Sequence, residues 1–362
     1  MKRWGLIFFF VCFSLVAQDD ITSSRQNAIT RSVKKALPAV VGINVVQIQE
    51  FTYGNPFFND DFFSQFFPKQ KYYDKVKGLG SGFIISSDGY IVTNHHVING
   101  AVEIVVTLTD GTKYPAKIVG GDKTTDIALL KIEPERKLKY LEFGDSEKLL
   151  IGEWVIAMGN PFGLFDINSQ PTVTVGVISA TNRDFGLVDN DHVYQNMIQT
   201  DAAINGGNSG GPLLNSNGEV IGMNTFIYSG SSTSKTSIGI GFAIPIHRID
   251  KIISELKSNG KVDRYFTMGF RYQQVDQMIA KYLGLKELRG IVVSEIIKNG
   301  PAENAGLLVG DLIVKINDKP INSEYDFRKI TLGDDLRAGD VVDVEVLREK
   351  KRLTFQLKLG KV

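Results

Sequence analysis

Apolar positions along the chain fall into short strand-like runs and one helical stripe. Residues 89–94 (GYIVTN) and the apolar run Ile127–Leu130 each predict a strand. The helical stripe ends at Gly260, which favours a helix C-terminus there. Its apolar members are Ile246, Ile249, Ile252, Ile253 and Leu256. A strand-rich unit of about one hundred residues follows, a usual domain size. The pattern therefore predicts two domains with a boundary just after this helix.

The start of the chain predicts a signal peptide. Two basic residues at positions 2 and 3 precede an apolar stretch, Trp4–Ala17, and two aspartates follow it. This stretch is shorter than the ~20 residues that a membrane-spanning helix needs. We expect residues 1–17 to be a signal peptide cleaved near Ala17, with an uncleaved, membrane-associated anchor as the alternative. Cys12 is the only cysteine and lies in this segment, so the mature protein would form no disulfide.

Composition limits the classes of partner. The chain has 362 residues, enough for two domains with separate cores. Its 41 Lys and Arg against 40 Asp and Glu give no electrostatic argument for binding nucleic acid or an anionic membrane. Neither clustered metal ligands nor a phosphate-binding loop occurs in the sequence, so no cofactor or metal is implied. We expect a polypeptide partner.

The segment GNSGGPL, Gly207–Leu213, places Ser209 in a glycine-rich turn. A serine nucleophile needs backbone N–H groups aimed at the developing oxyanion, and neighbouring glycines allow that close approach. The amides of Gly207 and Ser209 are the expected donors of this oxyanion hole. Taken alone, the segment fits a catalytic serine and a plain turn between strands equally well.

Two other segments supply a candidate base and a candidate acid. Among the four histidines we favour His96, at the end of the predicted strand 89–94, and expect His95 to face the other side by strand alternation. We interpret His192, in a polar loop, and His247, at a helix start, as structural. Asp126 opens a buried strand, where its carboxylate needs a partner such as the imidazole N–H of His96. The alternative for Asp126 is a turn or capping residue.

The motifs TNHHV, DIALLKI and GNSGGPL, in that order, resemble the catalytic motifs of the HtrA/Deg family of trypsin-fold serine proteases. Further support comes from GLGSGFIIS, MGNPFGL, QTDAAIN and GIGFAIP. The resemblance implies a mainly β fold, with a two-barrel, trypsin-like protease domain at residues 18–262. It also implies Ser209 as nucleophile, His96 as base and Asp126 as the residue that orients it. A homotrimer assembled through the protease domains is implied as well.

Residues just before the nucleophile bear on activation and specificity. The family usually has proline where this chain has Gly206, and the freer backbone predicts an oxyanion hole that depends on activation. Six residues before Ser209 the chain has Ala203, without charge, followed by Ile204. These two residues predict an apolar S1 pocket of modest size. The alternative, equally weighted, is that both pack the barrel core.

Three segments predict loops. Ile227–Ser237 is small and polar, and Asn182–Asn196 is charged and poorly periodic. The resemblance implies that such loops carry the activation signal. Phe51–Tyr73 is rich in phenylalanine and has no strand or helix period. It is either a self-packed insertion or an exposed surface for substrates or neighbouring subunits.

The second domain, residues 263–362, resembles a single PDZ domain of the HtrA type. Its landmarks are RGIVVSEI, GPAENAGLLVGDLIVKINDKPI and the closing strands VVDVEVLRE and RLTFQLKL. PDZ domains bind a C-terminal peptide as an added strand and capture its carboxylate with backbone amides. By resemblance, the capturing loop is Thr267, Met268, Gly269 and Phe270, and Glu324–Leu332 is the helix that forms the far wall of the groove. Alternatively, MGF simply begins a strand.

Together these features predict a periplasmic, or otherwise extracytoplasmic, serine endopeptidase. It would degrade unfolded or damaged envelope proteins and recognise chain ends through its PDZ domain. The competing hypothesis is a chaperone or peptide-binding scaffold with little proteolysis. The full set of His96, Asp126 and Ser209 argues against it, because a pure binding protein has no need for all three.

Overall fold

The structure is a computed structural model that describes residues 25–53, 70–160, 165–188, 192–225, 239–285, 287–333 and 336–362. The predicted signal peptide with Cys12, and the predicted loop Ile227–Ser237, lie outside the described residues. The chain forms two compact units. One runs up to Arg183 and again from Asn196 to Lys261; the other contains Asp184–Gln195 and Val262–Val362. In the described part of the chain, no helix is long and apolar enough to cross a membrane.

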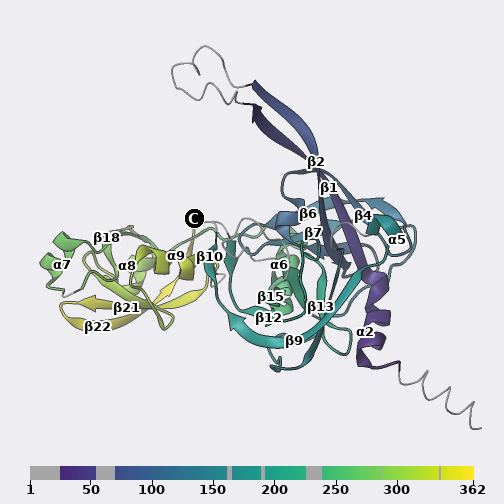
Figure 1. Cartoon of the computed structure of the whole chain (residues 1–362). Helices are drawn as coiled ribbons and strands as arrows, with labels where there is room; N and C mark the ends of the chain where they lie inside the picture. The colour runs from purple at the N-terminus through teal and green to yellow at the C-terminus, as the bar shows by residue number, and fades with distance from the viewer. Residues whose placement is uncertain are drawn as a thin grey trace, which may run out of the picture. The chain divides into compact units, whose positions relative to one another are not determined.

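The first unit starts with helix α2 (Ala28–Ala36) and a 3₁₀ turn, Leu37–Ala39, and continues into a seven-stranded antiparallel sheet ordered β5-β4-β1-β2-β3-β7-β6. Its strands are β1 (Val40–Tyr53), β2 (Gln70–Ile84), β3 (Tyr90–Thr93), β4 (Ala101–Thr107), β5 (Lys113–Pro115), β6 (Lys117–Asp122) and β7 (Ile127–Lys131). The first four residues of β7 are buried, which confirms the strand predicted from its apolar run. β1 and β2 pair along their whole length as a long hairpin that projects from the sheet (Figure 1). Both ends of the predicted Phe-rich loop therefore belong to these strands, and its middle is outside the described residues.

Six further strands of the first unit close into a barrel ordered β12-β15-β14-β13-β8-β9 (Figure 1). They are β8 (Trp154–Gly159), β9 (Thr172–Arg183), β12 (Met197–Thr200), β13 (Pro212–Leu214), β14 (Val220–Thr225) and β15 (Gly241–Pro245), with a short helix α5 (Phe165–Asn168) between β8 and β9. Apolar side chains from these strands and the loop before β13 fill one core cluster. Its buried members include Val155, Ala157, Ile178, Ile198, Ala202, Ile204, Leu213 and Ala243.

Helix α6 (Ile246–Asn259) confirms the predicted apolar stripe, because all five of its predicted residues are buried. Gly260 ends the helix in the left-handed conformation, φ +70°, and its N–H donates to Leu256 O at 2.9 Å. Glycine adopts this backbone conformation without steric penalty, which explains why the helix stops there.

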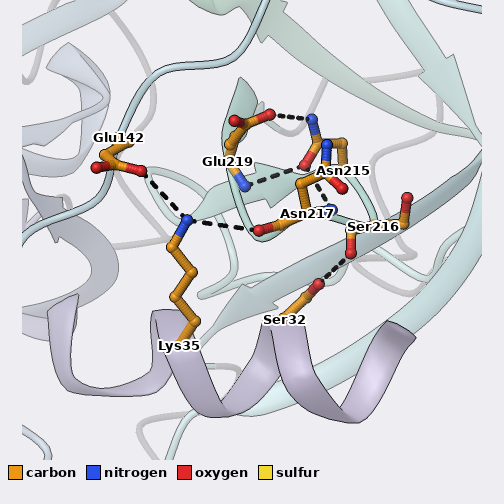
Figure 2. Close-up of polar contacts among 7 residues, drawn as sticks. All are labelled: Ser32, Lys35, Glu142, Asn215, Ser216, Asn217 and Glu219. Carbon is orange, nitrogen blue, oxygen red and sulfur yellow. Dashed lines mark hydrogen bonds and ion pairs between the residues drawn. The ribbon is translucent and has the colours of Figure 1, made fainter. Parts of the chain in front are cut away.

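Helix α2 docks on the turn between β13 and β14. Ser32 Oγ donates to the carbonyl of Ser216 at 2.5 Å, and Lys35 Nζ contacts Glu142 Oε2 at 3.2 Å, the contacts drawn as dashed lines in Figure 2. Ser32 is almost fully buried, whereas the Lys35 ion pair is exposed. A contact nearly two hundred residues apart in sequence therefore fixes the far end of the hairpin that follows the GNSGGPL segment.

The segment Asn182–Asn196, predicted as an irregular loop, contains a small two-stranded sheet. β10 (Gly186–Val188) pairs with β11 (His192–Tyr194), from Gly186 opposite Tyr194 to Val188 opposite His192. His192 therefore lies in a strand rather than a loop, and its ring stacks on Tyr194 with centroids 5.9 Å apart. The prediction was wrong because charged and polar residues hide a strand period in hairpins this short.

The second unit is built on a sheet ordered β17-β18-β19-β21-β22, with β20 added beside β19. Its strands are β17 (Phe270–Gln274), β18 (Ile291–Ile296), β19 (Leu312–Ile316), β20 (Lys319–Pro320), β21 (Val341–Arg348) and β22 (Lys351–Lys358), and β16 (Phe266–Thr267) pairs with β23 (Gly360–Lys361). Its helices are α7 (Gln277–Leu283), α8 (Pro301–Ala305) and α9 (Glu324–Gly333). The predicted closing strand pair is confirmed as β21 and β22, and a separate apolar core fills this unit.

Candidate active site

Ser209 lies in the turn that leads into β13 and is 5% exposed. Gly207 and Gly210 flank this turn with φ +97° and +85°, a region that favours glycine. A β-carbon at Gly210 would collide with the carbonyl oxygen of Ser81 and with Thr93 Oγ1. The glycines around Ser209 are therefore required both by backbone conformation and by close packing.

His96 sits in a short helix, α4 (His95–Ile98), and not at the end of a strand. The strand-alternation argument for the two histidines was therefore wrong, because β3 ends at Thr93 and the chain turns before His95. The preference for His96 as the base is nevertheless supported by its contacts. Its Nδ1 lies 2.8 Å from Asp126 Oδ2, and its backbone N–H donates to Asp126 Oδ1 at 2.9 Å.

Asp126 is fully buried and has φ +59°, an uncommon conformation for an aspartate. Asp126 ends a turn and directly precedes β7. Its position therefore agrees both with the predicted start of a buried strand and with the alternative of a turn residue. A buried carboxylate is costly unless it is paired and hydrogen-bonded. Both of its oxygens accept hydrogen bonds from His96, which holds the imidazole with Nδ1–H toward the acid and the other ring nitrogen away from it.

Sequence reasoning missed a third group at this carboxylate. Thr225, the last residue of β14, donates from Oγ1 to Asp126 Oδ2 at 3.3 Å. The main chain of Asp126 is held as well, since Asn94 Nδ2 and the His95 N–H both donate to its carbonyl, at 3.0 and 3.1 Å. A polar pair, Asn224 and Thr225, ends an otherwise apolar, fully buried strand. This change from apolar to polar residues was the feature of the sequence that could have indicated a functional role for Thr225.

The turn with Ser209 and the helix with His96 are joined through Ser81 of β2. The Ser81 N–H donates to Ser209 O at 2.9 Å, and Thr93 Oγ1 donates to Ser81 O at 2.7 Å. Thr93 is three residues before His96, so the nucleophile turn lies against the strand end that leads to the base. Among the described residues, no hydrogen bond joins Ser209 Oγ to His96. Such bonds are often long in unliganded enzymes and tighten with substrate.

The backbone amides of Gly207 and Ser209 are the predicted donors of the oxyanion hole. Among the described residues, the N–H groups of Gly207 and Ser209 donate to no other backbone carbonyl, whereas the intervening Asn208 N–H donates to Asn205 O at 3.0 Å. An oxyanion hole requires two such donors that the surrounding protein does not already use. At Gly206, next to them, no atom of the described residues lies within 4 Å of the position a β-carbon would take.

The two residues predicted for the S1 pocket differ in position. Ile204 is buried in the barrel core cluster, and Ala203 is half-buried. A β-carbon at Gly241 of β15 would lie 2.9 Å from Ile204 Cδ1, so the isoleucine covers that glycine. The Ile204 side chain therefore packs in the barrel core, in agreement with the alternative given for it in the sequence analysis. The Ala203 carbonyl accepts from Thr174 Oγ1 at 2.8 Å.

The predicted carboxylate-capturing loop spans the end of β16 and the start of β17. Gly269 has φ +78°, and a β-carbon there would lie 2.7 Å from Pro301, so glycine is required. Its N–H donates to Thr267 Oγ1 at 3.0 Å, and its carbonyl accepts from the Ile297 N–H at 2.9 Å. Met268 and Phe270 are buried in the core of this unit. The MGF segment thus both forms a tight turn and begins a strand.

Strand β17 and helix α9 face each other across an aromatic contact. The rings of Tyr272 and Phe327 lie 4.7 Å apart, and Tyr272 Oη contacts Glu324 Oε1 at 3.4 Å. Burial raises the pKa of the Tyr272 phenol above its usual value, and the nearby carboxylate of Glu324 adds to this. Among the described strands β17 lies at the edge of its sheet, the position at which PDZ domains add a peptide strand.

No group of three or more His, Cys, Asp or Glu side chains that could hold a metal ion occurs in the described part of the chain. The remaining histidine of the sequence analysis, His247, lies at the start of α6 and its Nδ1 contacts Ser146 Oγ at 2.8 Å. This contact is consistent with a structural role.

Comparisons with known proteins agree with the fold. The trypsin-like peptidase domain family matches residues 80–223, and the PDZ domain family matches residues 267–359. A relative from Chlamydia trachomatis, named a periplasmic DegP-like serine endoprotease, is 44% identical over 96% of this chain and 71% of its own length. A relative of the same name from Rickettsia conorii is 46% identical over 78% of this chain and 53% of its own length.

Solved structures show the same similarity. An HtrA-type protease AlgW solved with a decapeptide aligns with TM-score 0.64 and 34% identity, over 91% of this chain and 98% of its own. A serine endoprotease from Yersinia pestis aligns with TM-score 0.58 and 32% identity, over 92% of this chain and 97% of its own. Fold and site together define a trypsin-like serine endopeptidase that carries a PDZ domain. The chain belongs to the HtrA family of DegP-like serine proteases, and it is an extracytoplasmic enzyme.

Proposed function

We propose that Ser209, His96 and Asp126 form the catalytic triad of this endopeptidase. His96 takes the proton of Ser209 Oγ as the hydroxyl attacks the scissile carbonyl, and Asp126 orients the imidazole and stabilises its charge. The Gly207 and Ser209 amides bind the oxyanion, and water activated by His96 then hydrolyses the acyl-enzyme. The observation that supports this most strongly is the pair of hydrogen bonds from His96 to the fully buried Asp126.

Substrate selection follows from the second unit. We propose that the PDZ domain, residues 263–362, binds C-terminal peptides on the free edge of β17 and captures their carboxylate at Thr267–Phe270. The protease domain, residues 18–262, then cleaves unfolded or damaged envelope proteins. Ala203 forms the S1 pocket, and Ile204 acts behind it by setting the position of Gly241. We further propose that the protein assembles as a homotrimer through its protease domains, which sedimentation of the mature chain would test.

Intact-mass detection of a fluorophosphonate adduct tests the triad. We expect one adduct on the mature protein, faster in the presence of an unfolded substrate, and none on Ser209→Ala. Ser216→Ala is a matched control, because Ser216 lies on the exposed far turn of the same hairpin. If folded wild-type protein remains unlabelled with and without substrate, or if Ser209→Ala is still labelled, the proposed triad is wrong. Suppression of aggregation by an unlabelled protein would favour a chaperone instead.

A further inference from the structure

Ser81 contacts the turn that contains Ser209, here called the nucleophile turn, although no sequence motif indicates this contact. It is fully buried in β2, opposite Gly42 of β1. Its N–H donates to Ser209 O at 2.9 Å, and its Oγ donates to Gly207 O at 2.6 Å. One residue of the first sheet therefore holds both residues whose amides are the oxyanion donors.

The Ser81 hydroxyl has a fixed direction. It accepts a hydrogen bond from the Asn160 N–H at 2.7 Å, so its own proton is left for Gly207 O. Asn160 follows β8, and its Oδ1 accepts from the Phe165 N–H at 2.7 Å. A hydroxyl that both donates and accepts at these distances cannot rotate without breaking a buried hydrogen bond, which is costly.

Close packing around Ser81 shows that the contact is specific. A β-carbon at Gly159 would lie 2.9 Å from Ser81 Oγ and 2.7 Å from Asn208 Cα. A β-carbon at Gly210 would collide with the Ser81 carbonyl. Glycine at both positions thus lets the serine reach the turn.

Gly207 needs such a restraint. It follows another glycine, Gly206, where a β-carbon would meet none of the described residues within 4 Å, so no side chain restrains this position. Two consecutive glycines allow the peptide planes to rotate at little energetic cost. The hydrogen bond from Ser81 Oγ fixes the peptide plane between Gly207 and Asn208. Through the Gly207 Cα this plane adjoins the plane that carries the Gly207 N–H, the first oxyanion donor, and so limits how that N–H can turn.

We infer that Ser81 is a positioning residue for the oxyanion hole, one that acts on the transition state through the Gly207 carbonyl. The inference rests on the proposed roles of Ser209 and of the Gly207 amide. An N–H that is misdirected loses much of its stabilisation of a developing charge, while substrate binding in the ground state depends on it little. Loss of the hydroxyl should therefore lower kcat and leave KM nearly unchanged.

The test compares Ser81→Ala with Ser32→Ala in the full mature chain. Ser32 is the matched control, because it is another buried serine whose Oγ donates to a backbone carbonyl, at the far end of the same hairpin (Figure 2). We expect Ser81→Ala to lower kcat for a peptide substrate about tenfold to a hundredfold, whereas Ser32→Ala keeps the wild-type kcat. Binding of a peptide boronate, whose adduct carries an oxygen in the oxyanion position, should weaken in parallel with kcat.

Further measurements separate positioning from general damage. The midpoint of the pH dependence of kcat/KM should stay at the wild-type value, because the variant leaves the His96–Asp126 pair intact. Far-UV circular dichroism and thermal unfolding monitor folding. If Ser81→Ala does not fold, Ser81→Cys keeps the shape and replaces the hydroxyl with a weak donor, and the same loss of kcat is expected.

Wild-type kcat in folded Ser81→Ala, an equal loss in Ser32→Ala, or an effect confined to KM would overturn the inference. The proposed triad is tested separately: it is wrong if the fluorophosphonate still labels Ser209→Ala. A protein that needs Ser209 but tolerates Ser81→Ala would retain the proposed function without this positioning role.

Discussion

Asp126 combines complete burial with a left-handed backbone conformation, two features that are unfavourable for an aspartate. The two hydrogen bonds to His96, the bond from Thr225 and the bonds to its carbonyl offset these costs. Strained residues of this kind cluster at active sites, where the surrounding structure determines them. At the scale of single residues, the site is therefore centred on this carboxylate.

Replacing Asp126 with asparagine should reduce kcat by a factor on the order of 10⁴, because an amide can place its N–H toward Nδ1 and favour the wrong imidazole tautomer. Steady-state cleavage of a peptide substrate measures the loss, with thermal unfolding as the folding control. Thr225→Val removes only the longer hydrogen bond and should cost far less. A kcat for Asp126→Asn within tenfold of wild type would contradict the assignment of Asp126.

At Gly206 the chain has glycine where the family resemblance leads us to expect proline. Its φ lies outside the left-handed region, a β-carbon there meets no atom within 4 Å, and its N–H donates to no backbone carbonyl among the described residues. A β-carbon and the loss of the N–H therefore meet no obstacle among the described residues, and proline would restrict the backbone before Gly207. We expect Gly206→Pro to raise basal peptide cleavage without added activator. Gly206→Ala, which restricts the backbone less, should have a smaller effect. Equal or lower basal cleavage in folded Gly206→Pro would contradict the idea.

At this scale, sequence reasoning finds residues with reactive side chains and misses those that act through hydrogen bonds to other residues of the site. Ser209, His96 and Asp126 were predicted from their types and motifs. Ser81 and Thr225 were not, since a small polar residue in a strand has many ordinary explanations. Only the approach of β2 to the nucleophile turn distinguishes Ser81 from other buried serines.

Among the elements, those with a strong apolar period were predicted well. The stripe of α6, its end at Gly260 and the pair of β21 with β22 agree with the structure. The short elements β10, β11 and α4 were missed, because three or four residues carry too little periodicity and are fixed by tertiary contacts. The turn at α4 mattered most, since it decides how His96 approaches Asp126.

The contact between β17 and α9 gives an alkaline dependence of stability. The raised pKa of Tyr272 means that the folded protein favours the neutral phenol. This contribution to stability is complete below the unfolded-state pKa of about 10 and is lost as pH rises through the higher folded-state pKa. We expect the free energy of unfolding of the second unit to fall above pH ~10 in wild type, and to fall less in Tyr272→Phe.

Denaturant unfolding between pH 8.5 and 11, monitored in the full chain, measures this difference, with the pH values chosen to bracket ~10. Tyr265→Phe replaces an exposed tyrosine of the same unit and corrects for the general effect of losing a phenol. If the free energy of unfolding falls with pH at the same slope in wild type and in Tyr272→Phe, the tyrosine titrates alike in the folded and unfolded states, and the prediction is wrong.

For the whole molecule, the order of motifs along the chain predicted the architecture, because each motif belongs to a different strand end of one fold. Sequence could not supply the way α2 returns to the turn at Ser216, since no pattern links residues so far apart. Nor could it show that one sheet of seven strands and one closed barrel share the site, with Asp126 and His96 from the first and Ser209 and Thr225 from the second.

The two units have separate apolar cores, which predicts two unfolding transitions in the full chain. Ile313 is fully buried in the core of the second unit, and Leu213 is fully buried in the barrel of the first. Replacing either with alanine should cost about 2–5 kcal/mol. Ile313→Ala should therefore lower only the Tm of the second unit, and Leu213→Ala only that of the first, in differential scanning calorimetry. If either substitution instead shifts both transitions equally, or if wild type shows one transition, then the units unfold cooperatively, and binding at the PDZ domain can stabilise the protease domain directly.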